Sequence, residues 1–425
     1  MMRLLLFVFV FLSASSWAQP TNQLIILTTF TRESLQPVLD AFQQYYPDVS
    51  FSVLHRRETS GLHLLNQDNH DIDVVLSSSL SLFSTLEEQQ RLLPLETLNF
   101  DSTSQQQRFM QHTINNVVIF GYSGLGLMWN QDYLDKHHLT RPERWEDLTA
   151  PEYFRHLVMS SPARSGTTHV MVENLLQRYG WKRGWQIILQ IGGNLAAVSA
   201  RSYGVSDSIT RGLAGIGLTI DSHAFSRQKH FPYIGFTYQP HSPLLPGYVA
   251  AVRNTNQALH SVALIRFLLS EEVQKKLAQD TLNKYALNQT LSQPLDITPI
   301  NLTQMQQRTI LIKLLFEQIV NQQLLRLNQA WQLIHEVRSL PLLTMAETRQ
   351  LNLAVKLAST PPITESQAED PILLEALSLN RQDISTLHHI NQWRQLMTSQ
   401  LDQAIAICEQ LIASKEHRQV HDEKA

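Results

Sequence analysis

The segment Leu157-Val158-Met159-Ser160-Ser161-Pro162-Ala163-Arg164-Ser165-Gly166-Thr167-Thr168 combines an apolar triplet with a polar loop, and an amphipathic run follows it to Arg178. This pattern predicts a strand, a loop and the N-terminus of a helix. Hydroxyls, one guanidinium and free backbone N–H groups would meet where the helix dipole adds partial positive charge, which is the chemistry that binds a phosphate or carboxylate. A helix cap formed by Ser165 or Thr167 uses the same geometry, so the loop alone leaves both alternatives open.

The same alternation of strand and helix runs through the first part of the chain. Short apolar runs at 24–27, 49–54 and 72–76 alternate with helical stretches at 35–46 and 80–90. A second set has apolar runs at 117–120, 125–129 and 216–220 and helical stretches at 168–179 and 181–191. All 15 glycines lie between Gly61 and Gly247, whereas the spacing of apolar residues is strongly helical from about Thr303. We therefore predict an α/β fold with a mainly parallel sheet, followed by an all-helical C-terminal extension that Pro361-Pro362 interrupts.

The order of these units predicts two interleaved lobes. Strands at 117–129 and 236–252 are expected to cross between the lobes as a hinge, with a ligand held in the cleft. We predict lobe 1 at 19–120 plus 245–300, lobe 2 at 121–244 and the helical region at 301–425.

The first residues have the features of a signal peptide. Arg3 precedes an apolar run at 4–12, and Ser16 and Ala18 place small residues where a signal peptidase reads them. The run is shorter than the ~20 residues that span a bilayer. The single cysteine, Cys408, lies near the other end, so neither lipoprotein attachment nor an internal disulfide is expected. We predict that 1–18 are removed by cleavage near Ala18 and that the mature protein is periplasmic.

The net charge limits the kind of partner. The formal charge of −3 becomes −4 once Arg3 is lost with the signal peptide, and this mild negative value disfavours nucleic acid as a partner. Affinity for an anion must therefore be local. We expect a monomer without a metal site or a cofactor.

Four segments resemble one protein family. These are 141–154, with Trp145-Glu146-Asp147-Leu148 and Pro151-Glu152-Tyr153-Phe154, the loop at 161–167, Glu58-Thr59-Ser60-Gly61, and Gly215-Ile216-Gly217-Leu218-Thr219-Ile220-Asp221. They resemble periplasmic binding proteins of the ferric-iron and phosphosugar transport type, over roughly 21–350 of the sequence. The resemblance implies the type 2 fold, in which two α/β lobes close on a ligand. It also implies binding without catalysis and a ligand that is a small, phosphoglycerate-like phosphorylated acid.

Candidate ligand-binding residues follow the predicted strands. In a cleft between lobes, ligands bind to loops at the carboxyl ends of strands, where helix N-termini converge. Helix capping, or a solvated surface position for Arg201, is the alternative at these positions. Asp221 would accept a hydrogen bond from a ligand hydroxyl, and His223 would donate to the anion when protonated. The predicted ligand-binding residues are Thr28, Thr29, Thr59, Ser60, Ser77, Ser78, Ser161, Arg164, Ser165, Gly166, Thr167, Thr168, Arg201, Ser202, Asp221 and His223.

Two other functions were weighed against this one. By the resemblance, iron carriers hold the metal with adjacent tyrosines late in the second lobe, but Tyr233 and Tyr238 are five residues apart here. A periplasmic hydrolase would need a motif such as G-x-S-x-G or H-E-x-x-H, and the sequence contains neither. We therefore expect a solute-binding protein that presents a phosphorylated ligand to a membrane permease or sensor kinase. Arg164→Ala should weaken binding at least tenfold, in line with a charge-assisted hydrogen bond, and leave the melting temperature nearly unchanged.

Overall fold

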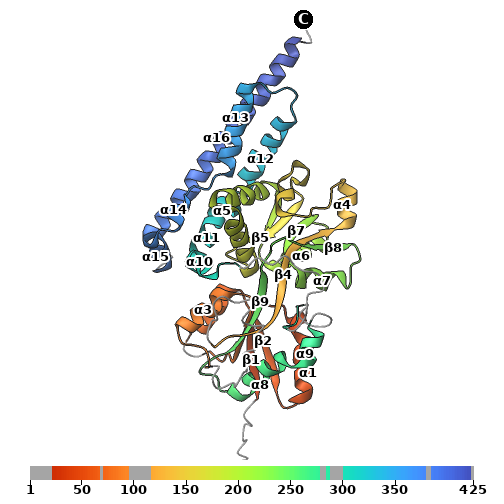
Figure 1. The fold of residues 1–425 in the computed structure, drawn as a ribbon, viewed down its shortest axis with the longest axis vertical. Coiled ribbons are helices and arrows are strands. Elements are labelled where there is room, and N and C mark those ends of the chain that lie inside the picture. Colours follow the sequence, from red (N-terminus) through yellow and green to blue (C-terminus); the bar gives the residue numbers. More distant parts are fainter. Residues whose placement is uncertain are drawn as a thin grey trace, which may run out of the picture.

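The computed structural model describes residues 22–67, 70–94, 116–277, 284–287, 300–379 and 384–422, so the predicted signal peptide lies outside the described residues. Two α/β lobes stand one above the other, and an elongated set of helices rises from the side of the upper lobe (Figure 1). This is the predicted α/β architecture with a helical C-terminal extension. The sheet is mixed, however, and not mainly parallel as predicted, because the strands that join the lobes run antiparallel to their neighbours. In the described part of the chain, none of the helices combines the length and the apolar character needed to cross a membrane.

Lobe 1 is built on a sheet with strand order β2-β1-β3-β9. Strand β1 pairs in parallel with β2 and β3, and β9 runs antiparallel to β3. Leu24, Ile26, Val74 and Phe42 are buried between this sheet and its helices. The bounds of the elements are β1 (Gln23–Thr28), α1 (Arg32–Tyr45), β2 (Ser50–His55), α2 (Glu58–Leu65), β3 (Val74–Ser77), α3 (Leu80–Glu88), β9 (Leu244–Ala251), α8 (Ala258–Leu269) and α9 (Glu271–Lys276).

Lobe 2 continues the sheet as β4-β7-β5-β6, with β8 on the other side of β4. Strand β5 pairs in parallel with β6 and β7. The carboxyl ends of β5, β6 and β7 therefore lie at one edge. The bounds are β4 (Val118–Asn130), α4 (Gln131–His137), two short 3-10 helices (Trp145–Thr149 and Pro151–Tyr153), β5 (Leu157–Ser160), α5 (Gly166–Asn194), β6 (Leu195–Ser199), α6 (Ser202–Thr210), β7 (Ile216–Ile220), α7 (Asp221–Gln228) and β8 (Ile234–Tyr238).

Strand β4 links the lobes. The two apolar runs expected within 117–129 form this one buried strand, because the glycines between them are accommodated inside the sheet. Its first half pairs with β9 up to Gly124, and its second half pairs with β7 and β8 from Leu125 onward. A Cβ atom at Gly124 would lie 2.6 Å from the Tyr238 ring, so this crossing point accepts no side chain.

Helix α5 consists of two helices joined at Gly180, whose φ of 74° is left-handed and favours glycine. The two predicted helices on either side of this residue are therefore confirmed. The part of α5 after Gly180 packs against the C-terminal helices. A Cβ atom at Gly193 would lie 2.1 Å from the Trp331 ring, so the missing side chain allows α12 to pack closely on α5.

The C-terminal helical region comprises α10 to α16 and a single π-helical turn. Figure 1 shows α10 and α11 beside α5, with α16 extending away from lobe 1 to the C-terminus. The apolar stripe of α16 is core, because Trp393, Met397, Leu401 and Cys408 are buried. Pro361-Pro362 lie between α13 and α14 and so interrupt the helices as predicted. The bounds are α10 (Leu302–Gln307), α11 (Thr309–Phe316), the π-helical turn (Glu317–Asn321), α12 (Leu324–Ser339), α13 (Met345–Ser359), α14 (Glu365–Ala368), α15 (Pro371–Leu379) and α16 (Ile384–Asp422).

Candidate functional site

A cavity lies between the two lobes. All of its lining residues stand at or just after the carboxyl end of a parallel strand: β1, β2 and β3 in lobe 1, and β5, β6 and β7 in lobe 2. This is where α/β sheets bind ligands. The lining residues are Thr29, Phe30, His55, Arg56, Arg57, Glu58, Ser77, Ser78, Ser79, Arg164, Ser165, Gly166, Thr167, Arg201, Ser202, Tyr203, Ile220 and His223.

The lobes approach each other closely around this cavity. A Cβ atom at Gly166 in lobe 2 would lie 3.5 Å from the Ser79 Cβ in lobe 1. The rings of His55 and Tyr203, again one from each lobe, have centroids 6.0 Å apart. The structure is therefore a closed form, in which both lobes can contact one small ligand.

The lobe 1 wall is rich in hydroxyl groups. The Oγ atom of Ser77 lies 2.8 Å from Thr29 Oγ1 and accepts a hydrogen bond from the Ser79 backbone N–H at 3.0 Å. The Ser79 hydroxyl caps α3 by accepting from the Leu82 N–H. Ser78 Oγ is buried and has no hydrogen-bond partner in the described structure. Because an unmet buried hydroxyl is costly, Ser78 is well placed to bind a ligand oxygen.

The lobe 2 wall is formed by the loop before α5. Ser165 Oγ accepts from the Thr168 N–H at 3.1 Å, so Ser165 caps the helix and also lines the cavity. The structure thus shows the cap, and the binding of an anion by Ser165 stays a prediction. Arg201 precedes α6, its Nη1 donates to the Tyr203 hydroxyl at 3.2 Å, and its guanidinium lies 5.7 Å from the centroid of the Tyr203 ring.

Helix N-termini add positive potential to the cavity. Helices α2 and α6 begin beside it, and neither has a side chain that caps its backbone N–H groups. Their N-cap residues are Arg57 and Arg201, both of which line the cavity. Uncapped N–H groups and the helix dipoles both favour an anion at this position.

The charges of the lining residues favour the same ligand. Four arginines line the cavity, and the one carboxylate there, Glu58, is already neutralised by an ion pair of 2.9 Å with Lys313. Burial raises the pKa of Glu58, but the Lys313 ammonium and the hydroxyls of Ser81 and Ser79 outweigh it and hold the pKa at about 2. A locally positive cavity therefore exists in a chain of net charge −3.

The two histidines of the cavity are neutral near pH 7. Burial, together with the charges of Lys284 and Arg227, lowers the pKa of His223 to about 4. Burial and the Arg201 charge also lower the pKa of His55. His223 was expected to act as a protonated donor, but with its lowered pKa it donates near pH 7 only as a neutral imidazole.

Ten of the predicted residues line the cavity: Thr29, Ser77, Ser78, Arg164, Ser165, Gly166, Thr167, Arg201, Ser202 and His223. Six do not. Thr28, Ser161 and Thr168 are buried beneath the lining. Thr59 and Ser60 are exposed in the first turn of α2, where helical rotation turns them away while Glu58 faces the cavity.

The sixth predicted residue, Asp221, lies away from the cavity lining. It is fully buried, and its Oδ2 accepts from the Gly124 N–H at 2.7 Å and from the Tyr238 hydroxyl at 3.3 Å, while its Oδ1 accepts from the Ser222 N–H. Burial raises its pKa to about 7. Asp221 therefore joins α7 to the crossing point of β4, and its oxygens are occupied within the protein.

Eight residues of the lining are not among the predicted ligand-binding residues: Phe30, His55, Arg56, Arg57, Glu58, Ser79, Tyr203 and Ile220. Arg56 and Arg57 directly follow the predicted strand at 49–54. The strand-end rule that identified Ser77 and Ser78 would have found both arginines if it had been applied to this strand.

The tyrosines considered for iron lie outside the cavity lining. Tyr233 donates to the Thr210 carbonyl at 3.0 Å, and the Tyr238 hydroxyl contacts the Tyr285 hydroxyl and donates to the Asp221 carboxylate. Among the residues that the structure describes, no group of three or more His, Cys, Asp or Glu side chains is placed to hold a metal ion.

Comparisons of the sequence point to one family. Residues 69–298 match the family described as bacterial extracellular solute-binding protein. The chain is 32% identical over 365 residues to the phosphoglycerate transport regulatory protein PgtC of Salmonella typhimurium, an alignment that covers 82% of this chain and 88% of that protein. The PgtC protein of Salmonella typhi matches to the same extent.

Solved structures share the fold at low sequence identity. The periplasmic binding protein AfuA from Actinobacillus pleuropneumoniae, with exogenous fructose-6-phosphate bound, has a TM-score of 0.56 at 19% identity, covering 73% of this chain and 97% of its own. Iron-bound HitA from Pseudomonas aeruginosa has a TM-score of 0.54 at 14% identity, covering 65% of this chain and 92% of its own. Both similarities support the predicted two-lobed type 2 fold.

Proposed function

Because this chain belongs to the bacterial extracellular solute-binding proteins, a family of binding proteins rather than enzymes, we propose that it captures a small phosphorylated organic acid between its lobes. The observation that supports this most is the inter-lobe cavity, where four arginines meet the uncapped N-termini of α2 and α6. The name of the Salmonella relative, a phosphoglycerate transport regulatory protein, agrees with this chemistry.

Both lobes would contact the anion. Arg164, the backbone of Gly166 and Thr167, and Arg201 would bind it from lobe 2, and the hydroxyls of Ser77 and Ser78 from lobe 1. Each charge-assisted hydrogen bond contributes roughly 1.5 to 3 kcal/mol net. Four or five such contacts, less the costs of desolvation and of holding the ligand, correspond to about micromolar affinity.

We further propose that the protein works in the periplasm and presents its closed, liganded form to a membrane partner, either a permease or a sensor kinase. A binding protein of this family must deliver or report its ligand, and the long helical region supplies surface that the two lobes do not need for binding. Deletion of the region after Thr303 should abolish signalling or uptake in cells, provided that the two remaining lobes stay folded.

The test is a thermal-shift screen, followed by titration calorimetry of the hits. The mature protein is mixed with 3-phosphoglycerate, phosphoenolpyruvate, hexose phosphates, inorganic phosphate and ferric citrate. A ligand at 100 times its dissociation constant adds about 2.7 kcal/mol of stability, so a true ligand raises the melting temperature clearly. We expect the phosphorylated three-carbon acids to give the largest rise.

Two results would contradict the proposal. Stabilisation by ferric citrate alone, with a visible charge-transfer colour, would identify an iron carrier. Equal and weak stabilisation by inorganic phosphate and by every organic phosphate would show an unspecific anion site.

A further inference from the structure

One turn of the C-terminal helical region contacts both walls of the cavity. Lys313 of α11 and Glu317, where the π-helical turn begins, are four residues apart and so lie on the same face. Lys313 Nζ pairs with Glu58 of lobe 1 at 2.9 Å, and Glu317 Oε1 pairs with Arg164 of lobe 2 at 3.0 Å. Both partners line the ligand cavity.

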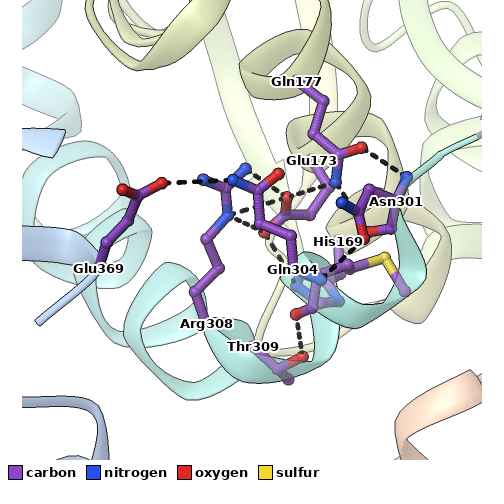
Figure 2. Close-up of polar contacts among 9 residues, drawn as sticks. His169, Glu173, Gln177, Asn301, Gln304, Arg308, Thr309 and Glu369 are labelled. Atoms are coloured by element: carbon purple, nitrogen blue, oxygen red, sulfur yellow. Dashed lines mark hydrogen bonds and ion pairs between the residues drawn. The ribbon is translucent and has the colours of Figure 1, made fainter. Parts of the chain in front are cut away.

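This turn is fixed to lobe 2 by buried contacts. Arg308, just before α11, donates to both carboxylate oxygens of Glu173 on α5 at distances between 2.7 and 3.1 Å (Figure 2). The two side chains are 4% and 0% exposed. Burial raises the pKa of Glu173, and the Arg308 guanidinium opposes that rise.

Further along the region, the attachment to lobe 2 continues. Asn328 of α12 donates to the carbonyls of Gly193 and Leu195, at 2.8 and 3.0 Å. Trp181 of α5 donates to the Ile363 carbonyl at 3.0 Å. When the lobes separate, α11 must therefore stay with α5.

The pair between Lys313 and Glu58 is different because it crosses from this lobe 2 unit to lobe 1. The two side chains are only 8% and 15% exposed, and Glu58 also accepts hydrogen bonds from Ser79 and Ser81 at 2.7 Å each. Opening the hinge would pull Glu58 away from Lys313. A buried, hydrogen-bonded ion pair of this kind is costly to break if either charge stays buried.

We propose that Lys313 is a positioning residue that holds lobe 1 closed on the ligand cavity, so that docking of the C-terminal helical region and capture of the anion stabilise each other. The part that concerns the anion rests on the proposed function. Lys313 is not one of the residues that line the cavity. It acts through Glu58, at the first turn of α2, and so fixes the position of the lobe 1 wall relative to lobe 2.

The coupling must work in both directions. If the contact of Lys313 with lobe 1 favours the closed form, the ligand must favour that contact by the same free energy. The affinity for the ligand is reduced by the fraction of molecules that are open, so loss of the contact weakens binding without any change in the groups that touch the ligand. The position of α11 relative to lobe 1 would thus report whether the cavity is occupied.

The test compares Lys313→Met with the wild-type protein. Small-angle X-ray scattering of the ligand-free proteins should show a larger radius of gyration for the variant. Calorimetry with 3-phosphoglycerate should show an affinity at least about threefold weaker. Lys313→Arg, which keeps the charge, should restore both values towards those of the wild type.

Glu317→Gln is the matched control for shape, because Glu317 and Arg164 both belong to the lobe 2 side. Its ligand-free radius of gyration should equal that of the wild type. A negative Glu58 left without its cation could also repel the anion, but that repulsion cannot change the shape of the ligand-free protein. The scattering measurement therefore separates the two explanations.

The outcomes also separate this inference from the proposed function. An unchanged radius of gyration in ligand-free Lys313→Met, whatever its affinity for the ligand, or an equal expansion in Glu317→Gln, would overturn the role of Lys313. If neither protein binds 3-phosphoglycerate but Lys313→Met still expands, the closing contact stands and the proposed ligand is wrong.

Discussion

The two lobes present different kinds of cation to the same cavity. In lobe 2, Arg164 is paired with Glu317 at 3.0 Å and Arg201 lies over the Tyr203 ring, so both guanidinium groups are held by neighbours. In lobe 1, Arg56 and Arg57 are exposed. Ordering an exposed arginine on a ligand costs side-chain entropy, whereas a guanidinium already held in place costs less. Under the proposed function, lobe 2 therefore offers the anion a prepared site, and lobe 1 supplies hydroxyls and adaptable charges when it closes.

The largest effect is expected on the free energy of unfolding, at the ion pair that fixes the C-terminal helical region to lobe 2. Arg308→Met leaves the Glu173 carboxylate buried without its cation, which should lower the free energy of unfolding by about 3 to 5 kcal/mol. The double variant Arg308→Met/Glu173→Leu should recover most of that loss, because no buried charge remains unpaired. Urea unfolding measures both. A loss below about 1 kcal/mol in the single variant would mean that this pair is not a buried anchor.

The next largest effect is expected on ligand affinity, at Arg164 in the lobe 2 wall of the cavity. Arg164→Ala should weaken binding of 3-phosphoglycerate at least tenfold by calorimetry, since one charge-assisted contact contributes roughly 1.5 to 3 kcal/mol. The melting temperature of the ligand-free protein should also fall, because Glu317 loses its partner. The ion pair thus revises the sequence-based expectation of an unchanged melting temperature. Arg164→Lys, which keeps the charge without the planar fork, should lie in between. Unaltered affinity in Arg164→Ala would remove this residue from the site.

The smallest effect is expected in lobe 1. Arg57→Gln should weaken binding less than about fivefold, because an exposed ion pair contributes at most about 1 kcal/mol and is screened by salt. The difference from the wild-type protein should shrink further in calorimetry at 0.5 M salt. If Arg57→Gln weakens binding as much as Arg164→Ala does, the contrast between a prepared and an adaptable wall is wrong.

Local sequence pattern predicted the elements well where one physical signal dominated. The strand at 216–220 and the helices on either side of Gly180 are present as expected. The runs at 117–120 and 125–129 were separated by Gly121 and Gly124, and they form a single strand because tertiary neighbours cover the glycines.

For the site, the strand-end rule identified the right edge of each sheet but not the direction of each side chain. Ile220 lines the cavity and Asp221, one residue later, turns to the crossing point of β4. Glu58 faces the cavity while Thr59 and Ser60 face solvent, because successive residues of a helix point in different directions.

The order of apolar runs, the polar residues after them and the position of the glycines were enough to predict two α/β lobes, a helical extension and the loops that line the cavity, because these follow from interactions between residues close together in the chain. The pairs of Lys313 with Glu58 and of Glu317 with Arg164 join residues more than 150 positions apart. No local pattern encodes such a pair. It exists only because the fold places α11 against both walls of the cavity, where burial makes each charge require a partner.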